Sequence, residues 1–406
     1  MELHPIISAM RRNKTGALLI AIQMGVTYAI LCNALFLIRQ RTALSQRPTG
    51  ADEDNILVID NLWASAHSDL PSRSQTDVVL LRSLPGVVDA FVSASYPLSN
   101  DGFSQPYYLQ PTQQHATATS AFYFGDEHAI HTLGLTLVAG RNFSPDEVAD
   151  LRDDEVARPK VVIVTRAFAG KMFPGGALGK FIYGEVDKSF AQVIGIVDRL
   201  QSPFTSASGD ASTYVDNSIL EPFRFLSAES YYIVRAQPGR LEATLQAAQK
   251  RLVDADPSRI LKRVRPLAAV RAEAYRDDRS LAIILGVVSI ALITVTVFGI
   301  VGLTSYWVSQ RQRQIGIRRA LGATRGAIVR HFQAESLLIA AVGVSAGVAL
   351  AMALNIWMVS SFETMRLPVI YLWIGATISI LADQLAVLWP ALRAASISPA
   401  SAARSA

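Results

Sequence analysis

The chain has 406 residues, of which 50% are hydrophobic and only 17% are charged. Soluble proteins carry about 25% charged residues, so this composition excludes a wholly soluble protein and indicates that part of the chain lies in lipid. The single cysteine, Cys32, excludes an intrachain disulfide and a thiolate zinc site.

The net charge of +5 comes from residues beside the hydrophobic segments. The long segment 39–279 contains more acidic than basic residues, whereas 309–333 contains six arginines and no Asp or Glu. A protein that binds nucleic acid needs its basic residues gathered on one face of a folded domain. We therefore expect no nucleic-acid partner.

Four segments are long and hydrophobic enough to cross a bilayer, which takes about 20 helical residues. They cover residues 17–38, 280–308, 334–359 and 369–389. The first follows a basic lead, as in a signal peptide, but its hydrophobic core is too long and no small-x-small cleavage site follows it. We predict an α-helical membrane protein with four transmembrane helices and a large α+β extracytoplasmic domain between helices 1 and 2.

The arginines also predict the orientation, because Lys and Arg gather in the short cytoplasmic loops of membrane proteins. The segment 309–333 is therefore expected in the cytoplasm, together with the lead at 1–16 and the tail at 390–406. The segment 39–279 and the short loop 360–368 are then expected outside. Three arginines just after the first helix are weaker signals in the opposite direction: Arg39, Arg41 and Arg47.

The segment 39–279 is long enough to bury a core of its own and mixes strand and helix patterns. Hydrophobic runs predict strands at 56–59, 87–95, 135–138, 161–165, 192–197 and 231–234. Helices are expected at 76–84 and 241–252, with irregular insertions around 98–120 and 200–225. Residues 267–279 are also compatible with a helix, so the second membrane helix is expected to continue into this domain as a stiff stalk.

The sequence contains no pattern typical of an enzyme, so we expect a chain without catalytic residues, metal or cofactor. His128 and His131 lack a nearby cysteine or acidic helix partner, which favours surface histidines over metal ligands. The run 175–180 (GGALGK) resembles a phosphate-binding loop but lacks the first glycine and the final Ser or Thr. A turn before a strand at 181–183 is expected there.

The most informative stretch is QRQRQIGIRRALGAT, at residues 310–324. It predicts a short basic helix over 311–321 that ends in a left-handed cap at Gly322, followed by a helix with Thr324 as its N-cap. Three residues share one face of the short helix: Ile317, Ala320 and Leu321. Attraction to anionic lipid would explain the charge of this stretch but not the order of its residues.

This stretch resembles the signature of the FtsX/MacB-type permeases of ABC transporters, which typically reads E-R-x-x-E-I-G-x-x-R-A-L-G-A. In that family the loop docks into a groove of an ATPase and couples the two subunits. The resemblance implies this coupling role for Arg311, Arg313, Ile315, Gly316, Ile317, Arg318, Arg319, Ala320, Leu321, Gly322 and Ala323. Gln310 and Gln314 replace the usual glutamates, which removes two ion-pair partners for the ATPase groove.

Other motifs extend the resemblance over almost the whole chain. Residues 84–87 (LPGV), 135–143 and 162–180 resemble segments of the family's outer domain in the same order. The helical spacing of hydrophobic residues in 1–16 resembles the family's cytoplasmic amphipathic elbow helix, and residues 390–400 resemble its terminal segment. Each motif is weak alone, but their order around four membrane segments makes the resemblance specific.

The resemblance implies the permease subunit of a MacB-like ABC transporter of the mechanotransmission type (type VII) in the bacterial inner membrane. The implied partners are a separate ATPase that binds ATP and Mg²⁺, a second copy or a related permease, membrane lipid and, in some members, a periplasmic adaptor. The expected activity is export of an amphiphilic peptide, antibiotic or lipid-modified molecule. The alternative is a membrane sensor or scaffold of the FtsX type, which signals to extracytoplasmic partners without transport.

Two features of the membrane helices have alternative interpretations. Gly343 and Gly347 form a G-x-x-x-G pair, which permits close helix contact either within the chain or between two copies. Asp383 lies within the fourth helix, roughly 9 Å from its cytoplasmic end. An acid at this depth is a candidate for function, although local pairing is favoured.

Overall fold

The computed structural model describes residues 14–63, 70–205, 214–362 and 365–396. The chain forms two compact units. One is a mixed α and β domain, Leu44–Asp277, here called the large domain, and the other, here called the helical unit, comprises the helices before and after it. Most of the elbow helix expected at 1–16, and the tail after residue 396, lie outside the described residues.

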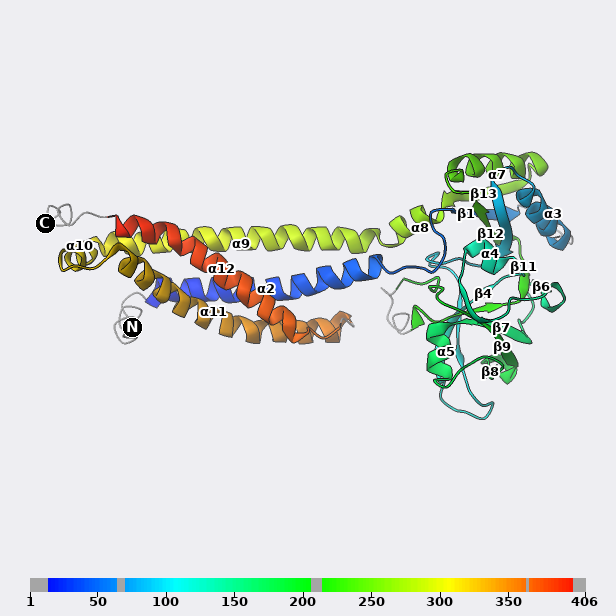
Figure 1. The fold of residues 1–406 in the computed structure, drawn as a ribbon, viewed down its shortest axis with the longest axis horizontal. Helices are drawn as coiled ribbons and strands as arrows, with labels where there is room; N and C mark the ends of the chain where they lie inside the picture. The colour runs from blue at the N-terminus through cyan, green and yellow to red at the C-terminus, as the bar shows by residue number, and fades with distance from the viewer. Residues whose placement is uncertain (1–13, 64–69, 206–213, 363–364, 397–406) are drawn as a thin grey trace. The chain divides into compact units, whose positions relative to one another are not determined.

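The helical unit contains four long helices, as the hydrophobic segments predict (Figure 1). They are α2 (Lys14–Ser45), α9 (Arg276–Gln310), α11 (Arg325–Phe362) and α12 (Val369–Ala395). Each is long and hydrophobic enough to span a membrane. A helix suits that environment because its backbone N–H and C=O groups pair internally, where lipid offers no partners. Polar residues continue α2, α9 and α11 beyond their hydrophobic segments.

The segment expected to form a continuous stalk is two helices in the structure. The helix α8 (Leu267–Ala274) ends at Tyr275, whose φ of −107° and ψ of 17° interrupt the helical path before α9 begins at Arg276. The Tyr275 side chain is 2% exposed, and its hydroxyl accepts a hydrogen bond from Gln201 Nε2 at 2.8 Å. Burial of this ring anchors the chain in the large domain and accounts for the break.

The large domain contains a four-stranded antiparallel sheet in the order β13-β1-β12-β2. Its strands are β1 (Ile56–Trp63), β2 (Val87–Ser93), β12 (Glu229–Ala236) and β13 (Arg259–Pro266). Alternate residues of these strands point to opposite faces. One face packs against the helices α3 (Leu70–Arg82) and α7 (Leu241–Ala255) through side chains such as Ile59, Leu81 and Leu252.

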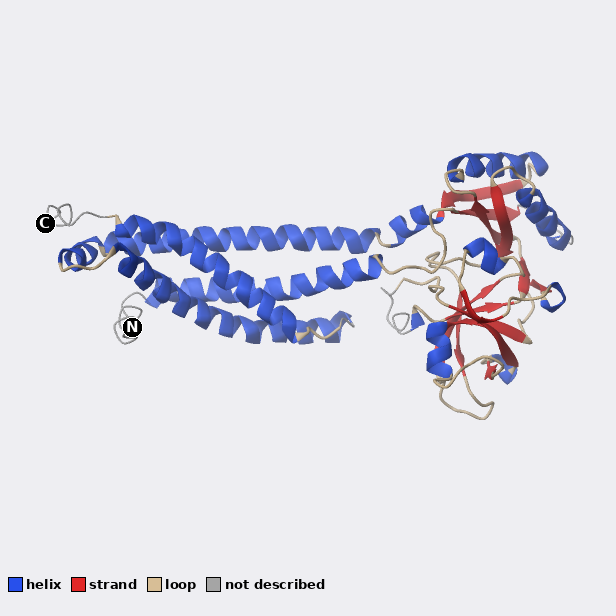
Figure 2. Cartoon of the chain, viewed as in Figure 1, coloured by secondary structure: helices blue, strands red, loops and turns tan. Residues whose placement is uncertain are grey.

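A second sheet has seven strands, in the order β3-β4-β10-β7-β9-β5 with β8 on β9 (Figure 2). Its strands are β3 (Phe103–Tyr107), β4 (Ala118–Phe124), β5 (Leu137–Gly140), β7 (Val161–Thr165), β8 (Phe181–Tyr183), β9 (Phe190–Val197) and β10 (Ser218–Glu221). The short helix α5 (Arg166–Met172) packs on one face, and a two-stranded sheet joins β6 (Ala149–Arg152) to β11 (Phe223–Leu226).

The two larger sheets share a hydrophobic core. The first sheet contributes Ile56, Phe91 and Ile233, and the second contributes Ile163 and Leu220, all nearly inaccessible to solvent. The short helix α4 (Ala129–Leu133) lies in the same cluster through its first and last residues. This shared cluster therefore joins the two larger sheets, and further clusters lie under α5 and beneath α3 and α7.

The six strands predicted from hydrophobic runs, the strand expected at 181–183 and the helices expected at 76–84 and 241–252 all have counterparts in the structure. Their ends differ by up to six residues, as in α3, which begins at Leu70. The turn expected at 175–180 is also present, with left-handed backbone at Gly176 and Gly179 just before β8. The expectation of irregular insertions is wrong in part, because 98–120 contains β3 and the start of β4, and 200–225 contains β10. β10 pairs with β4 and β7, which are distant in the sequence, so local patterns do not reveal it.

Candidate functional site

The segment between α9 and α11 folds into a helix, a tight turn and a second helix start. The helix α10 (Gln312–Ala320) is followed by Leu321 and by Gly322, whose φ is 99°. The Gly322 N–H donates to the Arg319 carbonyl at 3.1 Å, and the Ala323 N–H donates to the Arg318 carbonyl at 3.0 Å. These two bonds define a Schellman motif, as Gly322 predicts, and the left-handed conformation favours glycine there.

Thr324 caps the beginning of the next helix, α11, as predicted. The backbone N–H of Ala327 donates to the Thr324 hydroxyl at 3.2 Å, which satisfies one free donor at the start of α11. Only the turn at residues 321–324 separates α10 from α11. Two capping interactions therefore fix the geometry of the connection.

One side of α10 is anchored in the helical unit. Ile315 is 6% exposed and belongs to a hydrophobic cluster that includes Trp307 of α9, Phe332 of α11 and Ala391 of α12. Gly316 beside it is also buried. The short helix is therefore packed against the ends of three long helices and held in a defined orientation.

An ion pair fastens the beginning of this segment. Arg311 Nη1 lies 3.0 and 3.1 Å from the two carboxylate oxygens of Glu335 on α11. The Glu335 side chain is 5% exposed and the Arg311 side chain 18% exposed. An ion pair with so little solvent contact constrains both helices, because loss of either partner would leave a buried charge without a counter-charge.

The opposite side of α10 presents hydrophobic side chains to solvent. Ile317 is 53% exposed and Leu321 is 83% exposed, and Ala320 lies in the open beside them. Two exposed arginines flank these residues, Arg313 and Arg318. We call Ile317, Ala320, Leu321 and these two arginines the exposed face of α10. It combines a rigid backbone, a small hydrophobic centre and a positive rim.

The eleven predicted coupling residues have three kinds of position. Five form the exposed face. Ile315, Gly316 and Arg311 instead face the protein and hold the segment in place. Arg319, Gly322 and Ala323 take part in the backbone hydrogen bonds of the turn, and the side chains of Arg319 and Ala323 are half-buried. Sequence reasoning missed Glu335 as the partner of Arg311, and its only signal was a single acid at the start of a hydrophobic segment.

The glycines of α11 pack against α2 within the same chain. A Cβ atom at Gly343 would lie 2.8 Å from the Ala21 carbonyl oxygen, and one at Gly347 would lie 2.7 Å from the Tyr28 ring and 2.8 Å from the Gly25 carbonyl oxygen. Of the two interpretations of the G-x-x-x-G pair, the structure shows the contact within the chain. Because Gly343 and Gly347 have no side chains, the backbones of α11 and α2 can approach closely.

Asp383 of α12 is fully buried and locally paired. Its carboxylate accepts hydrogen bonds from the Ser336 hydroxyl on α11 at 2.7 Å and from Gln384 Nε2 at 2.8 Å. This arrangement agrees with the favoured interpretation of local pairing. It joins α11 to α12 through a polar contact inside the helical unit.

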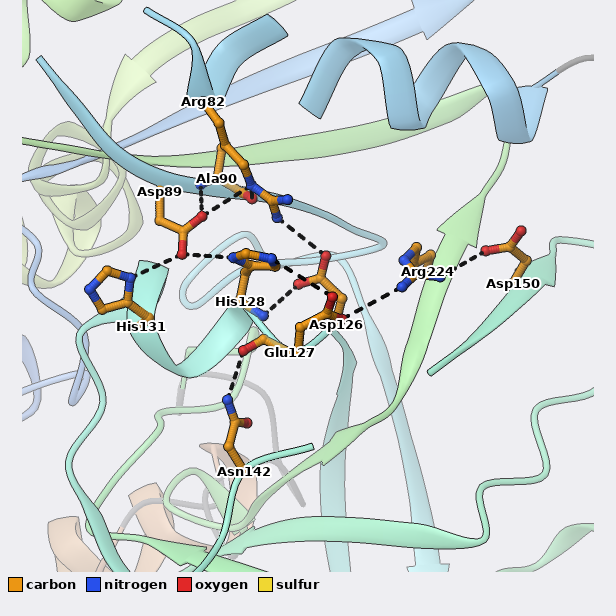
Figure 3. A network of polar contacts seen from close by, with 10 residues as sticks. All are labelled: Arg82, Asp89, Ala90, Asp126, Glu127, His128, His131, Asn142, Asp150 and Arg224. Atoms are coloured by element: carbon orange, nitrogen blue, oxygen red, sulfur yellow. Dashed lines mark hydrogen bonds and ion pairs between the residues drawn. The ribbon is translucent and has the colours of Figure 1, made fainter. Parts of the chain in front are cut away.

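In the large domain, the two histidines share one carboxylate (Figure 3). The Nδ1 atoms of His128 and His131 lie 2.9 and 3.0 Å from the same oxygen of Asp89, and Arg82 Nε lies 3.0 Å from the other oxygen. Burial alone would raise the pKa of Asp89, but the bonds from both histidines and a backbone N–H outweigh it and lower that pKa.

The same network continues through Arg82 to Asp126, whose pKa is raised by burial despite the nearby guanidinium. Within the described ranges, no group of three or more His, Cys, Asp or Glu side chains has the arrangement of a metal site. Both histidines keep surface exposure, as predicted, but their ring nitrogens are engaged with Asp89. The cluster is a structural link between α3, β2 and α4.

Two family profiles match the chain. The MacB-like periplasmic core domain matches residues 15–254, which is more than half of the chain. The C-terminal domain of FtsX-like permeases matches residues 286–399, which include α10 and its exposed face. The two matches together cover both units in the order expected from the motifs.

The chain is similar to proteins that are named as exporters. The macrolide export ATP-binding/permease protein MacB of Rhodopseudomonas palustris (strain HaA2) is 26% identical over 238 residues, which are 57% of this chain and 34% of the relative. The pyoverdine export ATP-binding/permease protein PvdT of Pseudomonas entomophila (strain L48) is 24% identical over 349 residues, which are 84% of this chain and 49% of the relative. The chain therefore spans half or less of the length of these relatives.

Among solved structures, the periplasmic region of MacB from Actinobacillus actinomycetemcomitans is similar to part of this chain. It covers 57% of this chain and 97% of that chain, with 15% identity and a TM-score of 0.35. The family assignment rests on the two profile matches, which agree with four hydrophobic helices and an α+β domain after the first. The chain belongs to the family of FtsX-like permeases with a MacB-like periplasmic core domain.

Proposed function

We propose that this chain is the permease subunit of a MacB-like ABC exporter in the bacterial inner membrane. The family assignment and the four hydrophobic helices support this proposal. In it, a separate ATPase binds ATP and Mg²⁺, two permeases pair in lipid, and a periplasmic adaptor can join them. Both termini and α10 lie in the cytoplasm, and the large domain lies outside.

The observation that carries the proposal is the exposed face of α10. Leu321 and Ile317 are hydrophobic, yet they stand in solvent on a helix that Ile315 and Arg311 hold rigidly. A rigid hydrophobic centre with a polar or charged rim is the usual composition of a protein interface. The exposed face of α10 therefore supports the docking of an ATPase subunit.

The connection from this face to the large domain runs through one helix. Directly before α10, α9 ends at Gln310, and its other end follows Tyr275 of the large domain core. Its 35 residues extend over about 52 Å at 1.5 Å per residue. Movement of α10 by an ATPase would thus reach the large domain through α9. In the proposed mechanism this movement drives export of an amphiphilic substrate on the outer side, so the substrate needs no path through the lipid.

A pull-down with two variants that each introduce one negative charge tests the docking role. The full chain is purified in detergent from its own host, and copurifying ATPase activity is measured for the wild type and for Leu321→Asp. We expect the activity recovered with Leu321→Asp to fall about tenfold or more, because a buried interface anchor contributes about 2 kcal/mol or more.

The matched control is Gln312→Asp, which adds the same charge at an exposed position of α10 away from the exposed face. It should recover about as much ATPase activity as the wild type. If the intact chain recovers no ATPase, or if both variants lose it equally, the coupling role fails. The FtsX-type sensor or scaffold then becomes the better interpretation.

A further inference from the structure

The large domain contains a cavity of about 280 Å³ next to its seven-stranded sheet. The sheet forms its floor, and residues of β6, β11 and the loop after β6 lie around it. Its volume is near the lower end of the roughly 300–1,000 Å³ typical of ligand pockets. The cavity therefore suits a small molecule or one arm of a larger one.

Aromatic rings form much of the cavity wall. Phe103 of β3 stacks on Phe122 of β4 with ring centroids 5.5 Å apart, and Phe124 stacks on Phe225 of β11 at 5.5 Å. These residues come together because alternate positions of a strand share a face and β3 pairs with β4 in register. Such a wall favours a hydrophobic ligand with a flat or flexible body.

A buried acid lines the same cavity. Glu221 ends β10, opposite Phe124 of β4, and is only 2% exposed. The Tyr107 hydroxyl donates to Glu221 Oε1 at 3.3 Å and itself accepts a hydrogen bond from Gln105 Nε2 at 2.9 Å. Burial raises the pKa of Glu221 to about 8. Among the described residues no Lys, Arg or His forms an ion pair with Glu221.

A lone acid among phenylalanines is costly unless something compensates it. Burial of an ionised carboxylate without a counter-charge is strongly unfavourable, so burial favours the neutral form of Glu221, and one long hydrogen bond from a hydroxyl offsets little of this cost. A residue kept only for packing would be hydrophobic at this position. The position of Glu221 is explained if a positively charged group enters the cavity and pairs with it.

The other charged residues of the cavity also favour a cation. Asp153 and Glu155 line it, together with a single arginine, Arg152. Arg152 Nε already lies 3.4 Å from the carboxylate of Asp154, which is not part of the lining. Negative charge therefore predominates around the cavity, and a ligand with a carboxylate or phosphate would be repelled.

We propose that this cavity binds a small amphiphilic amine, with its hydrophobic body against the aromatic wall and its ammonium group paired with Glu221. This binding site does not depend on the proposed function, because it requires neither an ATPase nor transport.

The test uses three probes that share one body and differ only in the terminal group. Radiolabelled 4-phenylbutylamine is bound to the full chain in lipid nanodiscs, and binding to empty nanodiscs is subtracted. The competitors are 4-phenylbutanol and 4-phenylbutyrate. We expect the amine to bind about 10- to 100-fold more tightly than the alcohol, the range expected for a hydrogen bond to a charged group, and the acid to bind most weakly.

Glu221→Gln keeps the size of the side chain and removes its charge, so it should abolish the preference for the amine and leave the affinity for the alcohol nearly unchanged. Glu242→Gln, an exposed acid on α7, is the matched control and should change neither. Phe225→Ala is a second variant that should weaken all three probes. Equal binding of amine and alcohol to the wild type, or full amine binding by Glu221→Gln or Phe225→Ala, would overturn the proposal.

The pH dependence gives a separate readout. The groups that share the cavity with Glu221 are Tyr107 from β3 and Arg152, Asp153 and Glu155 from β6 and the loop after it. Because burial raises the pKa of Glu221 to about 8, its binding form becomes more populated as pH rises towards that value. Amine affinity should rise on the order of tenfold per pH unit from pH 6 and level off above pH 8. Glu221→Gln should remove this rise.

Discussion

Replacement of Asp77 by alanine is expected to destabilise the large domain by about 3–5 kcal/mol. Asp77 on α3 and Arg259 on β13 form a bidentate ion pair in which both N–O distances are 2.8 Å. Their side chains are 4% and 2% exposed, and the Tyr232 hydroxyl also donates to Asp77 at 2.7 Å. Loss of the carboxylate would leave a buried guanidinium without a counter-charge and a buried hydroxyl without its acceptor.

Urea unfolding of the full chain in detergent measures this effect. Trp63 is a natural probe because it is the one tryptophan outside the four membrane segments, and the Arg259 guanidinium lies 4.5 Å from its ring centroid. The control is Asp198→Ala, which breaks a pair with Arg166 whose side chains are 51% and 63% exposed. Exposed pairs contribute about 0–1 kcal/mol. Equal losses for the two variants would contradict the importance of burial.

The second large effect is expected from Gly347→Leu in α11. The added side chain has no space, because its Cβ alone would lie within 3 Å of α2 backbone and of the Tyr28 ring. Overpacking of a well-filled contact costs about 1–3 kcal/mol, and here the obstacle is backbone, which cannot rotate away. We expect separation of α2 from α11 and a clearly lower unfolding temperature of the helical unit.

Gly302→Leu in α9 is the matched control, since a Cβ there meets no atom within 4 Å. Thermal unfolding of both variants is followed in detergent by size-exclusion chromatography after heating. The control should remain within about 0.5 kcal/mol of the wild type, as most substitutions at open positions do. A Gly347→Leu variant as stable as the control would show that the glycine contact is dispensable.

Much of the fold could be predicted because its signals are local. The strand at 161–165 is a continuous hydrophobic run. The hydrophobic segments of the four membrane helices are longer than any helix of the large domain. The strands β3 and β10 were missed for a different reason. Ser104, Gln105 and Pro106 interrupt the hydrophobic pattern of β3, and β10 has four residues whose partners, β4 and β7, lie far away in the sequence.

The same distinction applies to the sites. Gly322 and Thr324 act on neighbouring backbone groups, so their residue types alone predicted both caps. The pairing of Arg311 with Glu335 depends on how α9 and α11 pack. Glu221 carries no sequence signal at all, because an acid at the end of a short strand is ordinary until the fold surrounds it with aromatic rings.

The break at Tyr275 limits which movements of α9 can reach the large domain. An unbroken helix would transmit rotation about its axis as well as displacement along it. A helix that ends at a nonhelical residue transmits rotation less directly, because the backbone torsions of that residue can change; α9 begins directly after such a residue. Under the proposed function, α9 would therefore transmit displacement along its axis, while the buried Tyr275 ring holds the break between α8 and α9 in the domain core.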